Sequence, residues 1–218
     1  MQAERSVDIY SVGRRSQVTY QALLELVEKK NFFYIYETSK DLYIIDYSYH
    51  RSLYRNILKK SRDFIANKAK IDGSNETGGQ EEVGVRFFEG AAGSVMVGVT
   101  PVCDAFHQNF DWEDAVIKIP FDAANIDQTL EELDAQPERL QKIIIDNVVN
   151  SLLRHDWVYR WERILATVWL DSTPEIAARK ANLQNLAAMI SSPRNGERQA
   201  THLLNKIDIQ GNMRLQSG

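Results

Sequence analysis

Four charged residues, Glu81, Glu82, Arg86 and Glu89, lie within residues 81–93, a segment that also holds several glycines and alanines. An apolar run at 95–99 follows at once, so the pattern predicts a loop, a short helix and a buried strand. Carboxylates near a helix start, before small residues that let backbone approach a ligand, suit a hydroxyl-rich molecule that bears phosphate. Arg86 falls on the same helix face as Glu89, where it can orient that carboxylate or meet phosphate directly. The other interpretation is an ordinary amphipathic helix whose glutamates face solvent, because helix N-termini favour acidic residues.

Basic residues stand where two predicted strands end. Arg14 and Arg15 come after a predicted strand at 7–12. Lys68 comes after another at 63–67. Ligands of an open parallel sheet bind outside the carboxyl ends of its strands, and arginine forks pair well with a diphosphate. The pattern therefore predicts a phosphate-binding crevice, and the alternative is a set of solvated surface loops.

Short β-rich runs alternate with helical patterns through the first two thirds of the chain. This alternation predicts an α/β fold with a mainly parallel sheet and helices on both faces. Residues 68–80 carry the turn signals of an open loop, and Phe106 and Phe110 fall in a predicted short helix or turn. The predicted strands lie at 7–12, 32–36, 42–46, 63–67, 95–99 and 115–120. The predicted longer helices lie at 19–29, 50–60, 126–134, 138–153, 156–170 and 174–189.

The chain changes character after Leu170, which suggests one domain over residues 1–170 and a tail over 171–218. The tail joins an alanine-rich helical pattern to a polar end, so we predict a loosely attached helical extension and not a second domain. His155 and Asp156 stand at a break between two helical patterns. A His–Asp pair suits general base chemistry. Asp156 also suits the N-cap of the following helix, and we favour this structural role.

The spacing of Glu81 and Glu89, with Gly84 between them, resembles the double-glutamate motif of GT-B glycosyltransferases. The stretch 86–93, which leads into a strand, resembles more closely the group-1-like domain related to spore-protein glycosyltransferases. A second block at 152–161 is similar to a segment near the end of that domain. The resemblance covers roughly residues 7–170. It implies a Rossmann-like parallel sheet, the C-terminal, donor-binding half of a GT-B fold.

The resemblance also implies a function, the hexosyltransferase-type transfer of a sugar from a nucleotide diphosphate sugar to an unknown acceptor. Glu89 would accept hydrogen bonds from ribose hydroxyls, and Glu81 would lie nearer the sugar or phosphates as the catalytic residue. The remaining expected substrate-binding residues are Arg14, Arg15, Lys68, Gly84, Arg86 and Gly90. No cofactor is expected. No metal is expected either, because the chain has no Asp-x-Asp sequence and neither His107 nor Cys103 has metal-ligand partners at useful spacing.

A complete GT-B enzyme has two such domains with the active site between them, whereas 218 residues suit a single domain. We therefore expect the acceptor-binding wall to come from a missing N-terminal domain or from an oligomer partner. The alternative function is a non-catalytic nucleotide-sugar-binding module, or a truncated fragment that needs a partner domain.

Composition excludes several other classes. The chain is 44% hydrophobic and 26% charged, which is ordinary for a globular protein, and its net charge of −4 argues against a nucleic-acid partner. Cys103 is the only cysteine, so an internal disulfide is impossible and a reducing compartment is the simplest interpretation. We see neither a signal-peptide pattern nor an apolar run of membrane-spanning length. These observations predict a cytoplasmic protein without an integral membrane segment, although peripheral membrane contact stays open.

Overall fold

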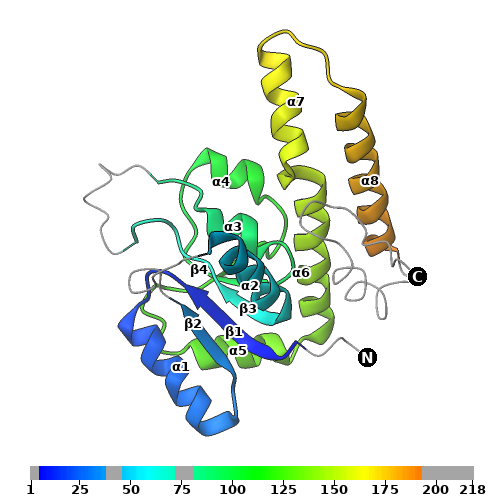
Figure 1. Cartoon of the computed structure of the whole chain (residues 1–218). Coiled ribbons are helices and arrows are strands. Elements are labelled where there is room, and N and C mark those ends of the chain that lie inside the picture. The colour runs from blue at the N-terminus through cyan, green and yellow to red at the C-terminus, as the bar shows by residue number, and fades with distance from the viewer. Residues whose placement is uncertain (1–4, 38–45, 72–80, 193–218) are drawn as a thin grey trace.

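The computed structural model describes residues 5–37, 46–71 and 81–192. These residues build a five-stranded sheet in which each pair of neighbouring strands is parallel (Figure 1). The strand order is β2-β1-β3-β4-β5. This confirms the predicted α/β fold with a Rossmann-like parallel sheet. The strands are β1 (Val7–Val12), β2 (Tyr34–Glu37), β3 (Ser61–Ile65), β4 (Val95–Gly98) and β5 (Ile117–Lys118).

The strand order reverses at β1, which pairs with β2 on one side and with β3 on the other. Consecutive connections therefore leave the sheet in opposite directions from this point. In an open parallel sheet such a topological switch point opens a crevice at the carboxyl ends of the two strands. Here the crevice lies between the segments that follow Val12 and Ile65.

Helices cover both faces of the sheet, because side chains along each strand alternate between the faces. Tyr10, Phe64 and Met96 belong to one core cluster, together with buried residues of the second, third and fourth helices. Ile9 and Val95 belong to a separate cluster, with buried residues of the first, fifth and sixth helices. The helices are α1 (Gln17–Lys30), α2 (Tyr47–Lys60), α3 (Val85–Gly90), α4 (Asp104–Asn109), α5 (Ile126–Asp134), α6 (Pro137–Asn150), α7 (Trp157–Thr167) and α8 (Pro174–Ser191).

Of the described strands only β1 has the predicted bounds: β2 lies at 34–37 instead of 32–36, β4 ends one residue early, and β3 and β5 differ as follows. The strand expected at 63–67 lies at 61–65, because α2 runs directly into β3 and Ser61 is both the helix C-cap and the first strand residue. The last strand is confined to Ile117–Lys118, although Ala115 and Val116 before it are buried.

Part of two other predictions falls outside the described residues. This holds for most of the strand predicted at 42–46 and most of the loop predicted at 68–80. Asp46, which ends the first of these segments, is the N-cap of α2 and accepts hydrogen bonds from the Ser48 and Tyr49 amides.

The break between α6 and α7 confirms the predicted N-cap at Asp156 and places the His155 ring among aromatic side chains. A π-helical turn, η2 (Ser151–His155), ends the first helix, and the Asp156 carboxylate accepts from the Val158 amide as the N-cap of α7. The His155 ring packs 4.9 Å from the ring of Phe88, and its Nε2 donates to the Asn109 carbonyl at 3.0 Å. Burial lowers the pKa of His155, so the ring stays neutral near pH 7.

The helical part of the tail is attached more firmly than predicted. α8 and α7 lie side by side, standing away from the sheet (Figure 1), and α8 also contacts α6. Ion pairs link Arg179 to Asp156 and Lys180 to Glu162. The prediction of a loose extension was therefore wrong for this helix, because its alanine-rich sequence still presents a buried apolar stripe. Residues 193–218 lie outside the described part of the chain. The buried α8 residues are Leu183, Leu186, Ala187 and Ile190.

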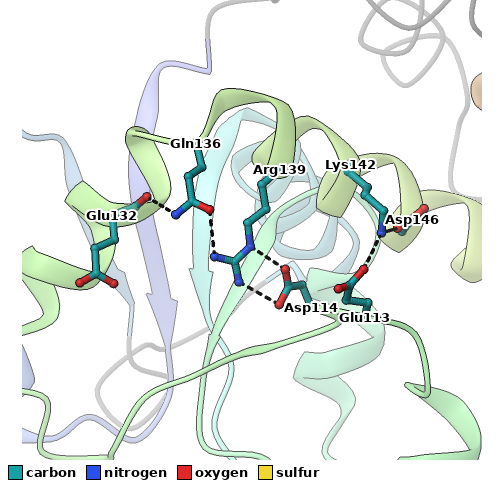
Figure 2. A network of polar contacts seen from close by, with 7 residues as sticks. All are labelled: Glu113, Asp114, Glu132, Gln136, Arg139, Lys142 and Asp146. Atoms are coloured by element: carbon teal, nitrogen blue, oxygen red, sulfur yellow. Dashed lines mark hydrogen bonds and ion pairs between the residues drawn. The ribbon is translucent and has the colours of Figure 1, made fainter.

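A polar network holds α6 against the loop that precedes β5 (Figure 2). Arg139 forms a bidentate ion pair with Asp114, with Nε–Oδ2 and Nη2–Oδ1 distances of 2.7 and 3.0 Å. Lys142 bridges Glu113 and Asp146 at 3.1 and 3.0 Å. We call these five residues the α6 network. Each of its two cations is paired with at least one of its three carboxylates, and these pairs link α6 to the loop that leads into β5.

Candidate functional site

A hollow of about 140 Å³ opens at the switch point, between the segment after β1 and the segment after β3. Gly13 makes the first turn possible, because its φ of +90° lies in the region that favours glycine. Asn67 fixes the second segment, since its side-chain oxygen accepts from the Val99 amide at 2.9 Å. The two backbone segments that border the hollow are therefore held in place by their connections to the sheet. Its polar lining residues are Ser11, Arg14, Asn67, Lys68, Lys70 and Arg86.

The lining of this hollow is cationic. Arg14 comes from the segment after β1, Lys68 and Lys70 come from the segment after β3, and Arg86 comes from α3. None of the described residues that line it is acidic. Cations that converge from three segments on one opening favour an anion with several oxygens, such as a diphosphate.

The two arginines after β1, both predicted to meet a diphosphate, have different surroundings. Arg14 lines the hollow. The Arg15 guanidinium instead lies 3.6 Å from the centre of the Tyr20 ring and 4.5 Å from that of Tyr36. The Tyr36 hydroxyl in turn donates to the Gly13 carbonyl at 3.1 Å. Arg15 thus stabilises the turn at Gly13 through cation–π contacts, and Arg14 is the arginine that lines the hollow.

Glu81, the predicted catalytic residue, is held by two donors. One carboxylate oxygen forms an ion pair with Lys68, and the other accepts from the Val102 amide. The hydrogen bond from Lys68 and that from the amide hold the pKa of Glu81 below its usual range. A carboxylate with a lowered pKa is a weak proton acceptor at neutral pH. The geometry therefore suits Glu81 to orient Lys68 at the hollow, and its catalytic role stays a prediction.

Arg86 and Glu89 meet on α3 as the sequence predicted, and a third residue joins them. Arg86 Nη1 lies 3.0 Å from Glu89 Oε2 and 2.9 Å from the hydroxyl of Tyr54 on α2. The Tyr54 hydroxyl donates to the same Glu89 oxygen at 2.7 Å. Arg86 and Glu89 side chains are each 31% exposed, so both are open to a ligand while their partner Tyr54 is buried. We call Tyr54, Arg86 and Glu89 the switch-point cluster.

Tyr54 is the member of this cluster that sequence reasoning missed. The sequence pattern placed Tyr54 on the apolar face of an amphipathic helix, and its burial agrees with this prediction. The available signal was its position four residues after His50, which places two polar groups on one face of α2. His50 contacts a different carboxylate, Glu37, which also accepts from the Tyr10 hydroxyl. Neither Tyr10 nor Glu37 lines the hollow.

The two predicted glycines differ in what surrounds them. Gly84 is the N-cap of α3, and a methyl group added there would lie 4.0 Å from its nearest neighbour, the Asn67 carbonyl oxygen. A methyl group at Gly90 would come within 2.7 Å of the Phe64 ring and 2.8 Å of Met96. The structure therefore places Gly90 in the core between α3 and the sheet, and Gly84 beside the segment that frames the hollow.

Comparisons with family models, with curated proteins and with solved structures found no match. The residues that the structure describes hold no group of three or more metal-ligating side chains gathered at one point. None of their helices has the length and apolar character that a membrane crossing needs.

Proposed function

We propose that this chain binds the donor of a glycosyl transfer reaction, a nucleotide diphosphate sugar, as the C-terminal half of a GT-B glycosyltransferase does. The observation that carries the proposal is the cationic hollow at the switch point, with Glu89 next to it. The sequence resemblance around Glu81 and Glu89 supplies the identity of the ligand. The hollow supplies an independent reason to expect an anion at this edge.

In the proposal the diphosphate lies in the hollow. Arg14, Lys68 and Arg86 contact its oxygens through charge-assisted hydrogen bonds, which are stronger than neutral ones. The Glu89 carboxylate accepts hydrogen bonds from ribose hydroxyls, because an ionised carboxylate is an acceptor and these hydroxyls are donors. Glu81 keeps Lys68 directed at the phosphates. The sugar then extends beyond the hollow toward the open edge of the sheet.

The reaction would break the bond between the anomeric carbon and the diphosphate oxygen. The oxygen of an acceptor hydroxyl forms the new bond to that carbon and loses its proton to a base. Negative charge grows on the leaving diphosphate, and cations already fixed around it stabilise the transition state without reorganising. The residues of this chain are thus assigned to donor binding and to leaving-group stabilisation.

The acceptor and its base are assigned to another surface, because the described residues form one sheet and one switch point. A second domain or an oligomer partner would close the cleft. Positioning two substrates in one cleft supplies on the order of 7–11 kcal/mol of such an enzyme's acceleration. We therefore expect the chain alone to bind donor and to transfer sugar poorly. Cytoplasm is the compartment proposed for it, in line with its single cysteine.

The test is calorimetric titration of the purified chain with UDP, GDP and ADP, and with the corresponding nucleotide-sugars. We expect saturable binding of at least one nucleoside diphosphate, with Arg14→Ala weakening it more than Arg15→Ala. Binding that is equal in these two variants would contradict the assignment of Arg14.

An assay of sugar transfer and of donor hydrolysis, with the oligomeric state measured alongside, separates the enzyme from a binding module. Transfer that appears when a partner domain is added supports the enzyme. Binding that never yields transfer favours the non-catalytic module. Efficient transfer by a proven monomer would contradict the assignment of the acceptor to another surface.

A further inference from the structure

The hydroxyl of Tyr54 joins two helices at the switch point. Its side chain is only 8% exposed, and its ring packs 5.7 Å from the ring of Tyr10 on β1. From this buried position on α2, the hydroxyl reaches both charged residues of α3. A rigid aromatic side chain from the core therefore forms hydrogen bonds with both Arg86 and Glu89.

The direction of these hydrogen bonds follows from the groups themselves. A guanidinium can only donate, so the Tyr54 hydroxyl accepts from Arg86. Its single proton must then go to Glu89, whose ionised carboxylate can only accept. Burial raises the pKa of Tyr54, so this proton is present throughout the neutral range.

The two donors meet Glu89 on the same oxygen, Oε2. The other oxygen, Oε1, receives no hydrogen bond from the described residues and is the one that a ligand would meet. α3 cannot impose this orientation alone, because it has six residues and no side-chain cap at its start. A pair of long side chains three residues apart on a helix surface contributes only about 0.2–0.5 kcal/mol.

We propose that Tyr54 is a positioning residue of the donor site, which holds Glu89 by Oε2 so that Oε1 faces the ribose. The inference rests on the proposed function, and it adds a residue that neither the motif nor the hollow includes. Tyr54 does not touch the ligand. It acts through Glu89, and removing its hydroxyl leaves Glu89 tethered by Arg86 alone.

Tyr10 offers a matched control for the Tyr54 hydroxyl. It is also a buried tyrosine, it packs in the same cluster, and its hydroxyl also donates to a carboxylate, that of Glu37, at 2.5 Å. Replacing either tyrosine by phenylalanine removes one hydroxyl and keeps the ring. A loss common to both variants would report the general cost of a buried hydrogen bond.

The experiment titrates wild type, Tyr54→Phe and Tyr10→Phe with whichever of UDP, GDP and ADP the wild type binds most tightly. We expect Tyr54→Phe to weaken binding about tenfold, the scale of one hydrogen bond to a charged group. Tyr10→Phe should bind as wild type does. Thermal unfolding of each variant records whether the fold is retained.

A double-mutant cycle supplies the readout that a structural role would not move. In the Glu89→Ala background Tyr54→Phe should have no further effect, because the group through which it acts is gone. Equal affinities of Tyr54→Phe and wild type, or a tenfold loss that persists in the Glu89→Ala background, would overturn this inference alone. A wild type that binds none of the three nucleotides would overturn the proposed function, and this inference with it.

Discussion

The switch-point cluster and the α6 network use the same residue types to different ends. Each contains an arginine within 3.0 Å of a carboxylate. In the switch-point cluster the arginine also lines a hollow, and Tyr54, whose hydroxyl hydrogen-bonds to both charged residues, is buried. In the α6 network each cation is matched by carboxylates, and Lys142 and Glu113 are 57% and 78% exposed.

This difference shows that ion pairing does not by itself mark a site in this fold. The α6 network has more charged members, yet it lies where a helix meets a loop and its charges are mutually satisfied (Figure 2). The switch-point cluster adjoins cations that face an opening at the carboxyl ends of the strands. The position relative to the sheet therefore decides which of two similar clusters can take a ligand.

The largest predicted effect concerns a third arginine–carboxylate pair, Arg62 with Asp63, which extends the comparison into the core. Asp63 is 1% exposed, and burial raises its pKa to about 6. Its folded-state pKa is above the unfolded value near 4, so it contributes stability at low pH that is lost as pH rises through about 6. Relative to wild type, the free energy of unfolding of Asp63→Asn should therefore rise by about 2–3 kcal/mol from pH 4 to pH 7.

Urea unfolding of wild type and Asp63→Asn at pH 4, 5, 6 and 7 measures this difference. Comparing the variant with wild type cancels the other titrating groups. A difference that stays constant with pH would show that the pKa of Asp63 is the same in the folded and unfolded states, so that the charge of Arg62 offsets the penalty of burial.

The second prediction sets one arginine of each cluster against the other. Arg86→Ala should weaken nucleoside diphosphate binding by about 2 kcal/mol. The substitution removes a cation from the hollow and also removes a hydrogen bond that Glu89 accepts. Arg139→Ala should leave binding unchanged and cost about 1 kcal/mol of stability or less, since its pair is partly exposed to solvent. Calorimetry and urea unfolding of both variants check this, and an equal loss of binding would remove the distinction between the clusters.

The third prediction separates the core side of α3 from its ligand side. Gly90→Ala should lower stability by about 1–2 kcal/mol, because the added methyl meets a ring and a methionine in a packed core. Gly84→Ala, whose added methyl has space, should change stability by about 0.5 kcal/mol or less. Chemical unfolding measures both, and an equal cost at the two positions would contradict the packing assigned to Gly90.

Much of the architecture could be predicted because it depends on local pattern. The alternation of strands and helices, the short helix before β4 and the N-cap at Asp156 follow from residue spacing and capping chemistry. The start of β3 was missed because α2 and β3 share Ser61 without a turn residue between them. The burial of α8 was missed because alanine spacing does not reveal which neighbours a helix meets.

The site was predictable only in part. Strand ends located the cations, and helical spacing paired Arg86 with Glu89. Local sequence could not show that Arg15 packs between two rings while Arg14 faces the hollow, because Tyr20 and Tyr36 lie on different elements. The role of Tyr54 was not predicted for the same reason, since its hydrogen-bond partners are more than 30 residues away in the chain.

Glu89 of the switch-point cluster and Glu113 of the α6 network allow a comparison of one carboxylate from each. Wild type, Glu89→Ala and Glu113→Ala are titrated by calorimetry with the nucleoside diphosphate that the wild type prefers. We expect Glu89→Ala to weaken binding by about 1–3 kcal/mol, roughly 5- to 150-fold, with its fold retained, and Glu113→Ala to bind as wild type does. Equal affinities of wild type and Glu89→Ala, or a wild type that binds no nucleoside diphosphate, would contradict this prediction.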